Sequence, residues 1–313
     1  MKLAVFAYHD IGYECLQHLL EAREEVVALV THQDDPKEEI WFRSAAQLAR
    51  ERGLPVYTPD SPNTASFMDL IRGLAPDIIF SFYYRRLLSQ DLLAVPRLGA
   101  INLHGSLLPR YRGRCPVNWV LIHGETETGV TLHHMVAKAD AGDIIAQRRV
   151  PIDDADTALA LHRKLTVAAR QLLVETYPLI KAGTAPRIPQ DPALATTFGG
   201  RRPEDGKIFW QSSAPAIHNL VRAVTRPYPG AFTCLRGRKL YLWETVVAGE
   251  CRAMEPGPSG NIRAIQPGSG ILVGTGEGHL MLKRLQLEGE EELSADVFAR
   301  EVRLQVGERL GEP

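Results

Sequence analysis

The first half of the chain alternates short, strongly apolar segments with longer segments in which apolar residues recur at helical spacing. The apolar segments, which predict β-strands, are residues 2–7, 26–31, 77–81, 100–104 and 129–135. The helical pattern covers residues 12–21, 41–52, 66–74, 89–93 and 116–123. Strands that alternate with helices predict a Rossmann-like α/β domain, in which helices cover both faces of a mostly parallel sheet.

The second half of the chain changes pattern twice. Residues 157–180 have the spacing of one long amphipathic helix, and the glycine at 183 marks its end. A segment rich in proline and glycine, residues 186–200, is the best linker. Short apolar runs with Gly and Pro turns follow and predict a small antiparallel β-barrel; they are residues 239–247, 260–265, 270–273 and 280–287. We therefore expect a catalytic domain over 1–190, a linker over 191–205 and a C-terminal domain over 206–313.

Composition places the chain among water-soluble globular proteins. Its 313 residues, 45% of them hydrophobic, suffice for two moderate cores. The apolar run at residues 3–7 is too short for a signal peptide or a membrane span, so we expect a cytoplasmic protein. The cysteines show no Cys-x-x-Cys spacing, which argues against disulfides and structural zinc; they are Cys15, Cys115, Cys234 and Cys251.

The charge balance argues against a nucleic-acid partner. Net charge is −1, and residues 206–313 carry 13 Lys and Arg against 12 Asp and Glu. Only residues 201–239 are locally basic, with eight basic residues against two acidic ones. Either a solvated surface or a phosphate-binding surface would have this composition.

The strongest chemical signal lies at the end of the predicted strand 100–104. Side chains at i and i+2 of a strand point to the same side, so Asn102 and His104 should project together. An imidazole can move a proton, and an amide NH2 can hold a developing oxyanion. The pair is therefore suited to the addition of a nucleophile to a carbonyl group.

Several segments together resemble the formyltransferases that use 10-formyltetrahydrofolate. They are INLHGSLLPRYRG (101–113), HGETETGVTLH (123–133), ADAGDI (139–144), VFAYHD (5–10) and FSFYYR (80–85). Within the family, the similarity is greatest to the formyltransferase domain of the bifunctional polymyxin-resistance protein. That domain formylates UDP-4-amino-4-deoxy-L-arabinose for lipid A modification.

The resemblance implies a set of site residues and an OB-like C-terminal domain. Asp140 would lie beside the imidazole of His104, where its charge would raise the pKa of that histidine. Asp143 is a competing carboxylate, for which a turn or capping role is favoured. The co-substrate would be 10-formyltetrahydrofolate, and the residues implied to bind it are Arg86, Leu87, Leu88, Arg114, Val136, Ala137, Lys138, Ala139 and Asp140.

Aromatic surface and guanidinium groups are the features expected of a nucleotide-sugar site. The candidates are Tyr83, Tyr84, Arg201 and Arg226. We expect no metal, because His133 and His134 would point to opposite faces of a strand, and His9, His32, His104, His123 and His218 lack a recognised ligand spacing. Ser106 lacks the second glycine of a nucleophile elbow, which argues against a serine hydrolase.

These observations predict an N-formyltransferase that acts on the 4-amine of UDP-4-amino-4-deoxy-L-arabinose, with folate and nucleotide-sugar partners. His104 would shuttle the proton, Asn102 would bind the oxyanion and Asp140 would tune the imidazole. The alternatives are methionyl-tRNA formyltransferase and a non-catalytic folate- or nucleotide-binding protein. The sequence leaves the oligomeric state open.

Overall fold

The structure, a computed structural model, describes residues 1–36, 38–249 and 258–311. The chain divides into two compact units, and each is discontinuous in sequence. The first unit comprises Met1–Pro116, Glu127–Ile152 and His162–Gly199, and the second comprises Val117–Thr126, Asp153–Leu161 and Gly200–Pro313. Cys15, Cys115 and Cys234 are free thiols, and Cys251 lies outside the described residues.

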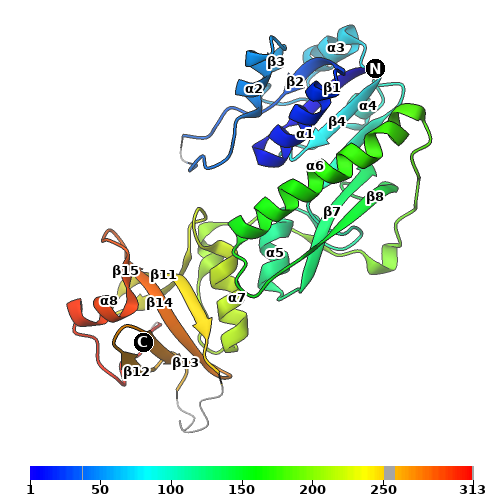
Figure 1. Cartoon of the computed structure of the whole chain (residues 1–313). Coiled ribbons are helices and arrows are strands. Elements are labelled where there is room, and N and C mark those ends of the chain that lie inside the picture. The colour runs from blue at the N-terminus through cyan, green and yellow to red at the C-terminus, as the bar shows by residue number, and fades with distance from the viewer. Residues whose placement is uncertain (37, 250–257, 312–313) are drawn as a thin grey trace. The chain divides into compact units, whose positions relative to one another are not determined.

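A seven-stranded sheet forms the centre of the first unit, with the strand order β3-β2-β1-β4-β5-β7-β8 (Figure 1). The strands are β1 (Lys2–Ala7), β2 (Glu25–Val30), β3 (Val56–Tyr57), β4 (Ile78–Phe82), β5 (Ala100–His104), β7 (Glu127–His134) and β8 (Ile144–Pro151). The pairings from β3 to β5 are parallel, whereas β7 pairs antiparallel with β5 and β8. The predicted mostly parallel α/β fold is thus confirmed.

This strand order reverses between β1 and β4, so the sheet is doubly wound. β1 and β4 are buried along nearly their entire length, as expected of strands covered by helices on both faces. In such sheets ligands bind beyond the carboxyl ends of the strands near the reversal. The polar segments that follow β1, β4 and β5 all leave the sheet at this edge.

The helices associated with this sheet agree with the sequence pattern except at their ends. They are α1 (His9–Glu21), α2 (Ala45–Glu51), α3 (Ala65–Leu74), α4 (Gln90–Leu93), α5 (Pro116–Ile122) and α6 (Ala158–Ala182). α2 begins four residues later than predicted because the Ser44 hydroxyl accepts the backbone N–H of Gln47 and caps the helix. Strands β3 and β8 were not predicted.

The proline-rich segment that joins the two halves of the sequence is not a passive linker. Ile188 pairs with Ile144, and β9 (Thr197–Phe198) pairs with β6 (Arg112–Gly113). The short helix η1 (Pro192–Leu194) lies between these two contacts. Residues 188–198 are therefore part of the first unit, and they run beside the loop that follows His104.

The second unit contains a smaller antiparallel sheet where the sequence predicts a small antiparallel β-barrel, and the antiparallel pairing is confirmed. Its strand order is β10-β11-β14-β13-β12, and β15 pairs with β14. The elements are η2 (Pro203–Gly206), α7 (Ala214–Val224), β10 (Ala231–Leu235), β11 (Arg238–Val247), β12 (Ile262–Gln266), β13 (Gly270–Gly274), β14 (His279–Leu287), β15 (Leu293–Ser294) and α8 (Ala295–Glu301). β10 and α7 were not predicted.

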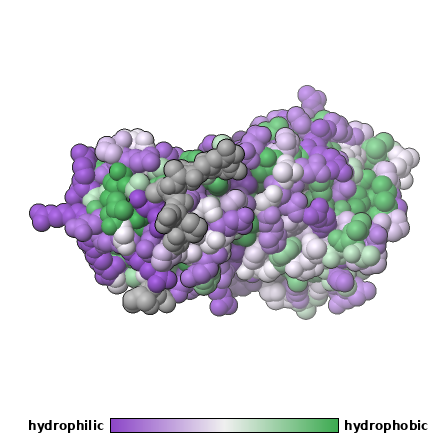
Figure 2. Space-filling model, turned by 90° about the horizontal axis from the view of Figure 1, so that it is seen from below, coloured by the Kyte–Doolittle hydropathy of each residue, from purple (hydrophilic) through white to green (hydrophobic). Residues whose placement is uncertain are grey.

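Hydrophilic residues cover most of the face drawn in Figure 2, and hydrophobic residues appear in small groups between them. Among the described residues, no helix combines the length and the apolar character needed to cross a membrane.

Candidate active site

Asn102 and His104 lie at the carboxyl end of β5, and the neighbouring strand adds a histidine that the sequence analysis did not place there. Asn102 is paired with His133 of β7 across the antiparallel ladder. The Nδ2 atom of Asn102 lies 3.1 Å from Nε2 of His133. From the sequence, His133 was weighed only as a metal ligand. Its position opposite Asn102 follows from the register between two strands, which the sequence pattern does not give.

His104 is held in one tautomer by the loop that follows it. Its Nε2–H donates to the carbonyl oxygen of Tyr111 at 2.7 Å. Because a carbonyl oxygen only accepts, Nδ1 is the nitrogen that is left to take up a proton. Oδ1 of Asp140 lies 3.6 Å from this Nδ1 and can stabilise the imidazolium that would form.

The Asp140 carboxylate connects the two histidines. Its Oδ1 also lies 3.5 Å from Nε2 of His133, and its Oδ2 accepts the backbone N–H of Gly113 at 2.8 Å. The side chains of His133, His104 and Asp140 are only 2%, 8% and 13% exposed. Asp140, the carboxylate implied by the resemblance, thus lies beside His104. The competing carboxylate, Asp143, instead contacts Arg187 at 3.4 Å.

Burial and charge act in opposite directions on this cluster. Burial lowers the pKa of His104 below its ordinary value, although the Asp140 charge and the Tyr111 carbonyl both act to raise it. The upward shift expected from the carboxylate is therefore outweighed, because desolvation disfavours the imidazolium more strongly. Burial disfavours ionised Asp140, yet His104, His133 and the N–H of Gly113 together hold the pKa of Asp140 well below its ordinary value. At neutral pH, His104 is a neutral base beside an anion.

The orientation of the Asn102 amide follows from the tautomer of His133. Nδ1 of His133 lies 2.8 Å from the carbonyl oxygen of His134 and must donate to it. With Nδ1 turned to that carbonyl, Nε2 of the ring faces Asn102, and the amide Nδ2 lies 3.1 Å from it. The second N–H of the amide remains to donate to an oxyanion.

Gln190 is a second residue that the sequence analysis missed. Its Nε2 donates to the carbonyl oxygens of Asp140 and Gly142 at 2.8 and 2.7 Å. Its Oε1 accepts from the guanidinium of Arg112 at 3.1 and 2.6 Å. Asp140 has a φ of 54°, a conformation that residues other than glycine seldom adopt. Gln190 therefore helps to hold the backbone that aims the carboxylate.

The turn after β5 allows its backbone to approach neighbouring segments closely. Gly113 has a φ of 95°, and a Cβ there would lie 2.3 Å from the carbonyl oxygen of Phe198. A Cβ on Gly105 would lie 2.0 Å from the hydroxyl of Tyr83. Ser106 donates its hydroxyl hydrogen to the carbonyl oxygen of Arg110 at 2.7 Å, which is a role in shaping the turn.

The residues implied to bind folate lie in two loops and one turn of the first unit. Leu87 and Val136 are exposed apolar side chains, 72% and 46% accessible, in the loops after β4 and β7. Leu88 is buried, and Arg86 donates to the carbonyl oxygen of Pro59. Ala137, Lys138, Ala139 and Arg114 are exposed. Asn63 holds the first loop, because it donates to the Leu87 carbonyl and accepts the N–H of Ser89.

The four residues proposed for the nucleotide-sugar side lie in different surroundings. Tyr83 follows β4 and contacts Gly105 beside the catalytic strand. Tyr84 packs edge-on against Phe6 and stacks on His32, and it is partly buried against the core. Arg201 and Arg226 belong to the second unit. Their guanidinium groups lie over Trp119 and Trp243, and Arg226 also contacts Glu292 at 3.0 Å.

Family models match both parts of the chain. A family model described as formyl transferase matches residues 1–177, and one described as formyl transferase, C-terminal domain, matches residues 201–303. The chain therefore belongs to the formyl transferase family, and the predicted resemblance is confirmed at that level. It is an enzyme of the formyltransferase class.

Solved structures share the fold at low sequence identity. An N-formyltransferase from Helicobacter canadensis, in complex with folinic acid and dTDP-3-aminofucose, is 20% identical with a TM-score of 0.72, covering 90% of this chain and 98% of that one. WlaRD, a sugar 3N-formyl transferase studied with dTDP and 5-N-formyl-THF, is 19% identical with a TM-score of 0.69, covering 93% and 99%. HypX from Aquifex aeolicus with tetrahydrofolic acid is 18% identical with a TM-score of 0.62, covering 98% and 48%.

Proposed function

We propose that this enzyme transfers the formyl group of 10-formyltetrahydrofolate to the 4-amine of UDP-4-amino-4-deoxy-L-arabinose. The observation that carries the chemistry is the buried cluster in which one carboxylate contacts His104 and His133 while His133 orients Asn102. Membership of the formyl transferase family supports the same reaction. A cytoplasmic location and a role in lipid A modification and polymyxin resistance are parts of this proposal.

The geometry suits direct attack of the amine on the formyl carbon. A new C–N bond forms and the formyl oxygen becomes an oxyanion, to which the free N–H of Asn102 donates. Nδ1 of His104 accepts the proton that the amine loses, and Asp140 stabilises the resulting imidazolium. Collapse of the intermediate breaks the bond between the formyl carbon and N10, and the leaving nitrogen takes the proton from His104. No acyl-enzyme is formed.

The loops at the carboxyl edge of the sheet are the proposed folate site. Exposed Leu87 and Val136 offer apolar surface on which an aromatic ring could lie, close in sequence to the catalytic segments. Two of the solved structures of similar fold contain formylated folates, which supports this choice of co-substrate. We propose contacts from residues 86–88, 136–140 and Arg114.

The acceptor is proposed to be a nucleotide-linked amino sugar. Two solved formyltransferases of similar fold were studied with dTDP-3-aminofucose and with dTDP, which supports this class of acceptor. Tyr83 is the proposed sugar contact nearest to β5, the strand that carries Asn102 and His104. Contacts from Tyr84, Arg201 and Arg226 to the nucleotide sugar remain predictions. The choice of uridine and of the arabinose sugar rests on the resemblance of segments 5–10, 80–85 and 123–133.

A direct assay tests the proposal. The purified protein would be given 10-formyltetrahydrofolate with a UDP-4-amino sugar, a dTDP-amino sugar or methionyl-tRNA, and the release of tetrahydrofolate would be followed. We expect formylation of the UDP-amino sugar in preference to the other two, and micromolar to millimolar binding of UMP by calorimetry. Faster turnover of the dTDP-amino sugar would overturn the choice of base. Salt-sensitive tRNA binding without uridine nucleotide binding would move the acceptor to tRNA.

A further inference from the structure

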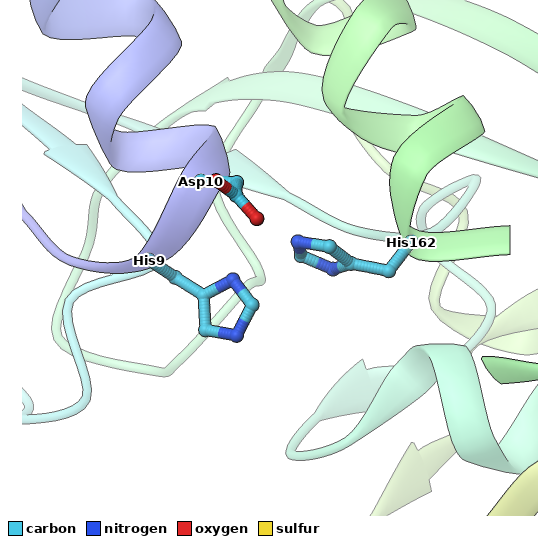
Figure 3. A group of neighbouring side chains, drawn as sticks. All are labelled: His9, Asp10 and His162. Atoms are coloured by element: carbon cyan, nitrogen blue, oxygen red, sulfur yellow. The ribbon is translucent and has the colours of Figure 1, made fainter. Parts of the chain in front are cut away.

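A second cluster of histidine and aspartate side chains shares no residue with Asn102, His104 and Asp140, and the ring of its His162 lies 5.8 Å from that of Tyr83. His9 and Asp10 form the first turn of α1, directly after β1, and His162 lies near the start of α6. Figure 3 shows that the three side chains are directed toward a common space. The first two residues are far from the third in sequence, so only the fold brings them together.

The three groups are close enough to share one ion. One ligand atom from each residue lies within 4.8 Å of the corresponding atoms of the other two. Nitrogen and oxygen ligands bind zinc at about 2.0–2.2 Å, which places two ligand atoms of one ion roughly 3–4 Å apart. Small side-chain rotations would close the difference, because all three groups already face the same space.

Two imidazole nitrogens in this cluster lack a partner. Nδ1 of His9 and Nε2 of His162 are buried and have no hydrogen-bond partner among the described residues. His162 is only 2% exposed, so water does not readily replace a missing partner. Buried polar atoms are almost always satisfied in proteins, and an exception calls for an explanation such as an ion. One ion between the rings would satisfy both atoms at once.

The ring of His9 is packed among aromatic side chains. The His9 ring stacks on Phe42 at 3.9 Å between centroids and meets Trp41 edge-on at 4.4 Å. These aromatic contacts hold the His9 ring in place.

The carboxylate is also oriented from behind. Oδ1 of Asp10 accepts from the backbone N–H and the Nε–H of Arg43 at 3.1 and 3.2 Å, which leaves Oδ2 for an ion. Ligating carboxylates usually carry such outer hydrogen bonds. Asp10, Trp41 and Arg43 line a cavity of about 890 Å³, so the carboxylate borders open space. The charge of Arg43 opposes a cation and weakens its binding.

We infer that His9, Asp10 and His162 form a binding site for one divalent transition-metal ion of the Zn²⁺ type. Two imidazoles and one carboxylate are a donor set that suits zinc, iron, cobalt and nickel ions. The bound ion fastens the turn between β1 and α1 to the start of α6. The ion has no role in the proposed formyl transfer, so this inference does not depend on the acceptor or on the catalytic residues.

Calorimetry with Zn²⁺ on the untagged chain tests the site, together with the visible absorption of added Co²⁺. We expect one ion per chain for the wild type. Asp10→Asn and His162→Asn should each weaken binding by at least about a hundredfold, because removal of an outer partner alone costs about 10–100-fold. His123→Asn, which changes an exposed histidine outside the cluster, is the matched control and should bind as the wild type does.

Two results would overturn the inference. One is the absence of Zn²⁺ binding by the wild type at millimolar concentration. The other is binding by folded Asp10→Asn that equals the wild type. Thermal melting of each metal-free variant reports whether it folds. Asp10→Asn preserves the shape of a residue that is not buried in the core, so this variant should fold. Its binding therefore tests the site even if His162→Asn does not fold. Added Zn²⁺ should raise the melting temperature of the wild type and of His123→Asn alone.

Discussion

The carboxyl edge of the sheet in the first unit and the sheet of the second unit use charged side chains in opposite ways. At the first, Asp140, His104 and His133 are 13%, 8% and 2% exposed, and two rings share one carboxylate. In the second, Arg236 beside Glu308 and Arg238 beside Glu290 keep 51% and 52% of their side chains exposed. One set is buried and interlocked, whereas the other is a series of separate surface pairs.

Under the proposed function, the buried cluster carries the reaction and the surface pairs do not. Exposed ion pairs contribute about 0–1 kcal/mol each, so the second set can change with little effect. A buried carboxylate is destabilising unless hydrogen bonds and charges satisfy it, and strongly shifted pKa values are typical of catalytic groups. We therefore expect substitutions in the buried cluster to affect turnover far more than substitutions among the surface pairs.

The largest effect is expected at His104. His104→Ala removes the group that takes the proton from the amine, and kcat should fall by roughly 10²–10⁴-fold while folate affinity changes little. Steady-state kinetics with a folate-binding titration would measure both quantities. Arg238→Ala, in the exposed pair of the second unit, is the control and should keep wild-type kcat. Near wild-type turnover by His104→Ala would remove the basis of the proposed mechanism.

Asp140→Asn should produce a smaller loss of kcat, about tenfold or more, together with a shift in pH dependence. The carboxylate raises the pKa of His104 against the effect of burial, so its loss lowers that pKa further. His104 then stays unprotonated to lower pH, and the acid limb of kcat/KM should move to lower pH. The pH profile of Asp143→Asn, on the same loop, should not move. An unchanged or upward-shifted limb in Asp140→Asn would contradict the assignment of the base.

Gln190 tests whether the segment after α6 positions the carboxylate. Gln190→Ala removes the two hydrogen bonds to the Asp140 loop, and kcat should fall by about tenfold with a smaller change in KM. Gln190→Glu should not restore kcat, because a carboxylate cannot donate to the two carbonyl oxygens. Gln17→Ala, which removes a surface hydrogen bond to Glu21, is the matched control. A rescue by glutamate would show that only packing matters here.

The smallest expected effect is that of chelation. The proposed reaction needs no Lewis acid, since Asn102 and His104 supply the oxyanion donor and the base. Turnover measured after exhaustive dialysis against a chelator should equal that before dialysis, even if an ion leaves His9, Asp10 and His162. Loss of turnover that added Zn²⁺ restores would show that an ion takes part in the reaction.

Much of the fold and part of the site could be read from local pattern. Alternating apolar runs and helical spacing predicted β1, β4, β5 and α6, because burial of apolar side chains follows the periods of the strand and the helix. The period of two also predicted that Asn102 and His104 point to one side. Asp140 was implied by family resemblance alone. The half-buried β8 and the short β3 have weaker patterns and were missed.

Only the tertiary structure decided the contacts between segments that are far apart in the chain. The register of β5 against β7 places His133 opposite Asn102, and the return of residues 188–198 brings Gln190 to Asp140. The path of α6 brings His162 to His9 and Asp10. The direction of the His104 pKa shift depended on how completely the fold buries that ring. The sequence by itself determined the local elements and the paired amide and imidazole, because these follow from interactions between near neighbours, whereas register, loop path and desolvation belong to the folded chain as a whole.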